Sequence, residues 1–170
     1  MIKKMILPVL LLILGCVRIP ENVVPVEGFE LDKYLGIWYE IARLDHSFER
    51  GLINVSAEYS MRDDGGIKVV NKGFDPKNNR WKETIGKAYF IDDSNIGRLK
   101  VSFLGPFYGA YNIIDLDKGS YSYSLVCGPN KSYLWILARE PHMEESLKTK
   151  LVTKAKDLGF ETEKMIFVSH

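Results

Sequence analysis

The sequence predicts an all-β fold: an eight-stranded antiparallel up-and-down barrel, with one C-terminal α-helix packed outside it and a short final strand. Two observations lead to this prediction. The chain carries eight short runs rich in aromatic and β-branched residues, separated by loops rich in Asp, Asn, Gly and Pro. A single amphipathic segment follows the last of these runs. Short loops favour hairpins between consecutive strands, and closing the sheet removes its exposed edges.

The N-terminus has the features of an export signal. The basic pair Lys3-Lys4 precedes an apolar stretch, residues 5–14, that is too short to span a bilayer comfortably. The stretch runs into Ile13-Leu14-Gly15-Cys16, which resembles a bacterial lipobox. The resemblance implies cleavage after Gly15 and lipidation of Cys16, so that acyl chains anchor the mature chain to a membrane. An ordinary secretory signal and an uncleaved anchor are the alternatives.

The predicted order of segments is a lipoprotein signal peptide (1–15), the lipidated cysteine with a stalk (16–30) and the folded domain (31–170). A stalk is expected because residues 18–28 contain Pro20 and Pro25 and show neither helical nor alternating periodicity. In bacterial lipoproteins an aspartate directly after the cysteine commonly retains the product in the inner membrane, and here that position is Val17. We therefore expect the chain at the periplasmic face of the outer membrane.

The charge balance and the histidines argue against several classes of function. The full chain has 23 basic and 22 acidic residues, so nothing favours nucleic acid as a partner. His46, His142 and His170 lie apart in the sequence, without Ser-His-Asp or metal-ligand spacing. We therefore expect no enzymatic activity, no metal and no cofactor.

Cys127 has no disulfide partner once Cys16 is lipidated. The domain must then be stabilised by its core alone. We expect Cys127 to be a small buried apolar residue, and a reactive thiol is the alternative.

The stretch Gly36-Ile37-Trp38-Tyr39 opens the first predicted strand, 37–44, and places a large aromatic side chain near its start. Arg139 ends the last predicted strand, 133–139. If these strands are neighbours in a closed sheet, the guanidinium of Arg139 can lie on the indole of Trp38, a cation–π contact worth roughly 0.5–2 kcal/mol. Gly36, Trp38 and Arg139 are therefore expected to form the floor of the barrel.

A longer loop, residues 45–52, follows the first strand and contains Phe48 and Leu52. A loop of this kind is a natural lid over the open mouth of a barrel. Its charged pairs Asp45-His46 and Glu49-Arg50 are expected to be solvated, because they show no catalytic or metal-ligand spacing.

The remaining predicted strands are 53–61, 67–74, 81–91, 98–104, 110–116 and 121–127. Alternate residues of a strand point to opposite faces, so Trp38 and Arg139 fix which side chains point inward. The predicted cavity side chains are Glu40, Ala42, Ala57, Tyr59, Val69, Ala88, Phe90, Val101, Phe103, Tyr111, Ile113, Tyr133, Trp135 and Leu137, with Phe48 and Leu52 at the mouth. Because several of these are small, the barrel is expected to hold one small ligand.

Glu40 is the difficult member of this set. An ionised carboxylate in an apolar interior is costly unless it is paired. A tyrosine, an arginine or a ligand headgroup could be its partner, and a β-bulge that shifts the parity is a further alternative.

After Arg139 the hydrophobic period becomes helical. Residues 144–158 carry apolar side chains at 147, 151, 155 and 158, with Pro141 ahead and Gly159 after them. This helix is expected to pack its apolar stripe on the outside of the barrel, and a final strand is predicted at 165–168.

Several motifs together resemble the lipocalin family. Gly36-Ile37-Trp38-Tyr39 and Arg139 carry the likeness, which extends through residues 34–43, 48–51, 59–66, 105–109, 125–129 and 133–139. They resemble the bacterial lipocalins of the outer-membrane lipoprotein type, whose relatives include apolipoprotein D and the plant temperature-induced lipocalins. At the place of a second motif common in lipocalins, Leu116-Asp117-Lys118 keeps only the aspartate.

The resemblance implies binding of fatty acids or lysophospholipids in the barrel, for lipid storage or transport in envelope maintenance under stress. It also allows a homodimer. A protein-interaction scaffold of the envelope, with a barrel that carries no lipid, is the alternative function.

Overall fold

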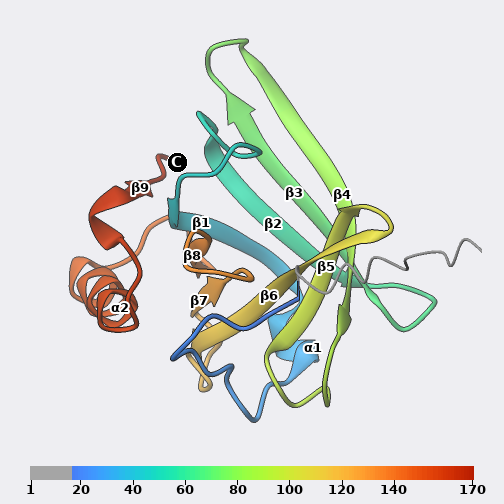
Figure 1. Ribbon diagram of the computed structural model, residues 1–170. Coiled ribbons are helices and arrows are strands. Elements are labelled where there is room, and N and C mark those ends of the chain that lie inside the picture. The colour runs from blue at the N-terminus through green and yellow to red at the C-terminus, as the bar shows by residue number, and fades with distance from the viewer. Residues whose placement is uncertain (1–16) are drawn as a thin grey trace, which may run out of the picture.

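A computed structural model describes residues 17–170, which form a closed antiparallel barrel (Figure 1). The barrel strands are β1 (Gly36–Leu44), β2 (Ile53–Met61), β3 (Ile67–Asp75), β4 (Arg80–Phe90), β5 (Arg98–Leu104), β6 (Phe107–Leu116), β7 (Tyr123–Cys127) and β8 (Leu134–Ala138). Each pairs with its neighbours in the chain, and β1 closes the sheet by pairing with both β2 and β8. The predicted fold class is confirmed. The predicted signal peptide (1–15) and the predicted lipidation site, Cys16, lie outside the described residues.

The strand boundaries are close to the predicted ones, and one of the larger shifts has a local cause. β7 begins at Tyr123, later than predicted, because residues 117–122 form a turn around Asp117. The Asp117 carboxylate accepts hydrogen bonds from the hydroxyls of Ser120 and Ser122 and from the backbone N–H of Gly119. These local bonds replace a strand ladder over the turn.

The segment before β1 lies against the barrel, which corrects the expectation of a stalk over residues 16–30. Val23 and Phe29 are buried. Val26 donates a backbone hydrogen bond to the Ile113 carbonyl and accepts one from the Gly97 N–H, both at 2.8 Å. Because the apolar side chains and backbone groups of this segment find partners on the barrel, the segment is held there.

A one-turn helix, α1 (Leu31–Tyr34), joins this segment to β1 and lies at the lower end of the barrel in Figure 1. The sequence does not predict it, because a single turn is too short to show a helical period. The helix places Tyr34 under the barrel, where the residue is 2% exposed. It therefore closes the end at which β1 begins.

A β-bulge interrupts the pairing of β1 with β8. Glu40 pairs with Leu137, but the next pair joins Ala42 to Ile136, so that Ile41 is the extra residue. A bulge of one residue reverses the inward and outward faces beyond it. Ala42 therefore points away from the cavity, and the parity prediction for this residue is wrong.

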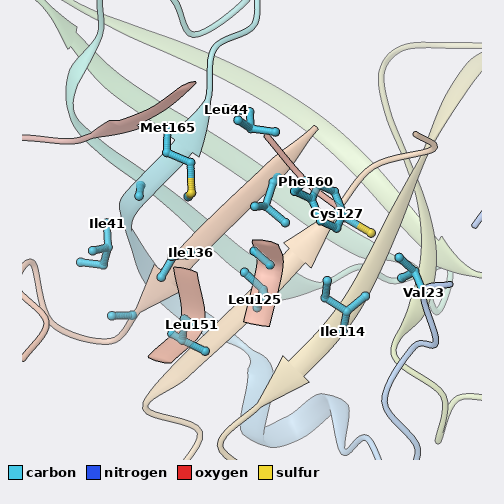
Figure 2. Close-up of a cluster of buried hydrophobic side chains, with 14 residues drawn as sticks. Val23, Ile41, Leu44, Ile114, Leu125, Cys127, Ile136, Leu151, Phe160 and Met165 are labelled. Carbon is cyan, nitrogen blue, oxygen red and sulfur yellow. The ribbon is translucent and has the colours of Figure 1, made fainter. Parts of the chain in front are cut away.

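The predicted C-terminal helix is α2 (Glu145–Asp157), which packs outside the barrel (Figure 1), and Figure 2 shows its Leu151 beside Leu125 and Ile136. Its Leu151 and Ala155 are fully buried against Leu125 and Ile136 of the sheet. Cys127 belongs to the same cluster and is fully buried, and burial raises the pKa of its thiol to about 12. The expectation that Cys127 is a small buried residue is confirmed.

After α2 the chain forms a short 3-10 helix, η1 (Thr162–Lys164), and a last strand, β9 (Met165–Phe167). The predicted final strand is confirmed, and it pairs with the end of β1, outside the barrel. Within residues 17–170, no helix is long and apolar enough to cross a membrane.

Candidate functional site

The floor of the barrel is built around Trp38, which is fully buried. The guanidinium carbon of Arg139 lies 4.0 Å from the centroid of the Trp38 ring, the predicted cation–π contact. Arg139 also donates hydrogen bonds to the carbonyls of Ile37 (2.8 Å), Lys33 (2.7 Å) and Leu35 (3.0 Å). The indole Nε1 donates to the Tyr34 carbonyl at 2.7 Å. One arginine thus joins α1, β1 and β8 at the closed end.

Gly36 lies within this floor with a φ of +96°. A Cβ at this position would lie 3.4 Å from Nη1 of Arg139. The glycine is required mainly for its backbone conformation, which other residues rarely adopt.

Above the floor lies a cavity of about 400 Å3, within the roughly 300–1,000 Å3 range of small-molecule sites. Most of the predicted side chains line it: Glu40, Phe48, Ala57, Tyr59, Val69, Ala88, Val101, Phe103, Tyr111, Tyr133, Trp135 and Leu137. The lining also includes Phe29, Leu31 and Tyr34 near the floor and Phe107, Tyr108 and Pro129 from the hairpin ends. Parity within strands cannot find these residues, because they lie before the first strand or next to turns.

Four predicted cavity residues do not line the cavity: Ala42, Leu52, Phe90 and Ile113. Ala42 lies in the cluster beneath α2, because of the bulge. Leu52 packs over Gly73 of β3, where a Cβ would lie 2.9 Å from its Cδ1. Phe90 and Ile113 belong to the core that fills the lower barrel. Parity gives the face of a strand residue, but packing decides how deep the open space reaches.

Three tyrosine hydroxyls form a chain in the cavity wall. The Tyr111 hydroxyl lies 2.8 Å from that of Tyr34 and 2.9 Å from that of Tyr59. Tyr34 also donates to Oγ of Ser124 at 3.3 Å. Burial raises the pKa of Tyr34 to about 12, so its hydroxyl stays neutral and bonded. This chain is one polar strip in a mainly apolar wall.

A second polar group lies where the mouth loop meets the barrel. Glu40 pairs with Arg43 at 2.6 Å, and both side chains are almost fully buried. Of the alternatives for Glu40, its partner is therefore an arginine, and the bulge that follows turns Arg43 toward it. Arg43 also donates to the Glu49 carbonyl at 2.9 Å, which ties the loop to β1.

The mouth loop is more buried than its sequence suggests. His46 and Glu49 are 5% and 7% exposed and pair at 2.9 Å, so the prediction of solvated charges is wrong for them. The Trp135 Nε1 donates to the Glu49 carboxylate at 3.1 Å, and the ring of Phe48 lies 3.8 Å from that of His46. The loop folds back on β8, and of its four charged residues only Asp45 and Arg50, which pair with each other, stay in solvent.

The two buried carboxyls have opposite pKa shifts. Burial, with the nearby charge of Glu49, raises the pKa of Glu40 well above its usual range. Burial alone would raise the pKa of Glu49 too, but the hydrogen bond and charge of His46 outweigh it, so the pKa of Glu49 is lowered. Glu40 therefore holds a proton more readily than Glu49, and its carboxyl lines the cavity.

The arrangement is suited to holding an apolar chain and contacting a few polar atoms. Among the described residues, no group of three or more His, Cys, Asp or Glu could hold a metal ion. Cys127 lies in the cluster beneath α2 and does not line the cavity.

Comparisons with known proteins agree with this geometry. The family model of the lipocalin-like domain matches residues 29–170. The outer membrane lipoprotein Blc of Vibrio cholerae is 54% identical over 154 residues, covering 91% of this chain and 90% of its own. Temperature-induced lipocalin-1 of Arabidopsis thaliana is 34% identical and covers 82% of this chain and 78% of its own. The structure of insecticyanin from Manduca sexta, 19% identical, superposes with a TM-score of 0.72 over 90% of this chain and 87% of its own.

Proposed function

The chain belongs to the lipocalin family, and from this premise we propose that it is an outer-membrane lipoprotein that carries a fatty acid or a lysophospholipid in its barrel. Its role is lipid storage or transport in envelope maintenance under stress. Relatives named as outer membrane lipoproteins, among them that of Escherichia coli K12 at 50% identity, support the location. The chain is then a carrier and not an enzyme.

The observation that carries the proposal is the cavity itself. It is closed at one end by Trp38 and Arg139 and lined mainly by apolar side chains. Burial of an acyl chain there stabilises a complex by about 0.8 kcal/mol per CH2 before the costs of ordering and association. The acyl chain lies along the apolar lining, and its polar end reaches the hydroxyl of Tyr59 or the carboxyl of Glu40.

Native mass spectrometry of delipidated protein mixed with a lysophospholipid tests this function. We expect one bound lipid per barrel. Ala57→Trp fills the cavity and should abolish uptake, whereas Glu58→Trp, on the exposed face of the same strand, should leave uptake unchanged. Equal uptake by both variants, with the circular dichroism of the wild type, contradicts the cavity as the binding site.

The anchor belongs to the same proposal. Cleavage after Gly15 makes Cys16 the first residue of the mature chain. Its sulfur and its amino group are then acylated, and the folded domain follows directly. Metabolic labelling with a palmitate analogue should mark the wild type and not Cys16→Ala. Label that persists in the variant means that Cys16 is not the acylated residue.

A further inference from the structure

The tip of the β5–β6 hairpin carries large apolar side chains in solvent. Leu104 is 75% exposed, and Phe107, its cross-strand partner, is 60% exposed. Phe103, also at this tip, is 36% exposed. Phe103 and Phe107 line the mouth of the cavity as well, so the tip and the mouth form one continuous apolar surface.

The first described residue is fixed to the same hairpin. The Val17 carbonyl accepts a hydrogen bond from Arg98 of β5 (3.2 Å), and the next carbonyl, of Arg18, accepts one from Asn112 of β6 (3.3 Å). Cys16 directly precedes Val17. A lipid on Cys16 therefore leaves almost no tether between the membrane and the barrel wall.

The tip is within reach of a membrane that holds this anchor. Five residues of β6 separate Asn112 from Phe107, which is about 17 Å at the rise of an antiparallel strand. Because β5 and β6 are paired from Arg98 to the tip, the anchor point and the apolar tip belong to one rigid element. Both reach one lipid surface when the β5–β6 hairpin lies along that surface.

Two lysines beside the tip carry positive charge, which complements the negative charge of an anionic lipid surface. Lys100 lies on the outer face of β5, with its Nζ 5.0 Å from the centroid of the Tyr108 ring. Lys87 of β4 pairs with Ser102, and its Nζ would lie 4.0 Å from a Cβ on Gly105 at the tip. Neither lysine forms a salt bridge with a described residue. Lysines around exposed apolar side chains favour binding to anionic lipids.

We propose that the β5–β6 tip docks into the bilayer that holds the Cys16 anchor, so that the mouth of the cavity opens against the lipid surface. Leu104 and Phe107 enter the headgroup region, and Lys87 and Lys100 lie against lipid phosphates. A lipid chain then passes between membrane and cavity along Phe103 and Phe107 without crossing water. The inference rests on the proposed function for its anchor.

Depth-dependent fluorescence tests the docking. Full-length, acylated Leu104→Cys protein is labelled with an environment-sensitive dye and placed in vesicles of phosphatidylethanolamine and phosphatidylglycerol. The buried thiol of Cys127, with its raised pKa, is not expected to react. The matched control is Ile37→Cys, 47% exposed on β1 at the closed end. We expect brominated lipids to quench most of the dye fluorescence at position 104 and to leave that at position 37 unchanged.

The outcomes separate the docking from the carrier function. Equal quenching at both positions, or none at position 104, overturns the docking. A blue shift at position 104 without quenching by brominated lipid also overturns it, because a second copy of the chain then covers the tip. Unlabelled Lys87→Gln/Lys100→Gln protein should lose affinity for phosphatidylglycerol vesicles, with unchanged lipid uptake in native mass spectrometry. Lost uptake with intact quenching contradicts the carrier function and leaves the docking in place.

Discussion

The guanidinium of Arg139 lies over the ring of Trp38 at 4.0 Å and also donates hydrogen bonds to the carbonyls of Lys33 in α1 and Ile37 in β1. The contact joins the last barrel strand to the first. Together with the ring of Tyr34, whose centroid lies 4.6 Å from that of Trp38, it leaves the indole fully buried.

Arg139→Met should weaken the fold. The variant keeps an apolar side chain on the indole, but it loses the cation–π attraction and leaves the carbonyls of Lys33 and Leu35 without their donor. We expect the free energy of unfolding to fall by about 3 kcal/mol. Urea denaturation measures it, with exposed Arg80→Met as the control. A midpoint equal to that of the control means that the floor is held by other contacts.

Gly36→Ala tests the backbone conformation of the floor. At a φ of +96° an alanine is strained, and its Cβ meets Arg139. The expected loss of stability is about 1–2 kcal/mol. Gly109→Ala is the matched control, because a Cβ there meets nothing within 4 Å. Thermal unfolding compares the two variants. An equal loss of stability in Gly109→Ala would contradict the explanation by backbone strain at Gly36.

Ala42→Leu distinguishes the bulged arrangement from simple alternation. Ala42 lies in the tightly packed cluster beneath α2, so a larger side chain should cost about 1–3 kcal/mol of stability through overpacking. Lipid uptake should not change, because the side chain points away from the cavity. Ala57→Leu, inside the cavity, is expected to reduce lipid uptake and to leave the stability nearly unchanged. Reduced uptake in Ala42→Leu would place the residue inside after all.

Glu40→Gln should change how stability depends on pH. The pKa of Glu40 is raised in the folded protein, so its contribution is complete below the unfolded pKa and is lost as the pH rises through the folded pKa. Glutamine stays neutral. The stability of Glu40→Gln relative to the wild type is therefore expected to rise as the pH increases above the usual pKa range of a glutamate.

Urea unfolding at several pH values measures this, with exposed Glu83→Gln as the control. Glu49 does not disturb the measurement. Its pKa is lowered, so its contribution is lost only as the pH falls below the usual range of a glutamate. A constant difference between Glu40→Gln and the wild type over the whole range means that Glu40 is ionised in the folded state.

Much of the fold could be predicted because its signals are local. Alternating aromatic and β-branched residues give the strands, and the change of period after Arg139 gives α2. The pairing of Trp38 with Arg139 needed one further assumption, that the sheet closes. Most of the strand residues that parity assigned to the cavity then line it, because alternation continues through any unbroken strand.

The errors lie where one residue or one long-range contact changes the outcome. The bulge at Ile41 moves Ala42 out of the cavity and turns Arg43 toward Glu40. Nothing in the local sequence marks the bulge, since all these residues are compatible with a strand. His46 and Glu49 have the charges of a solvated loop, and only their contacts with Arg43 and Trp135 bury them.

The sequence by itself determined the architecture, which is a closed barrel with its floor residues and a helix outside. These features depend on periodicity and residue type. The tertiary structure alone decided the depth of the cavity, the buried Glu40–Arg43 pair and the docking of residues 17–29 on the wall. These depend on which distant surfaces meet. Burial changes the free energy of a charge or an apolar side chain only once those surfaces are in contact.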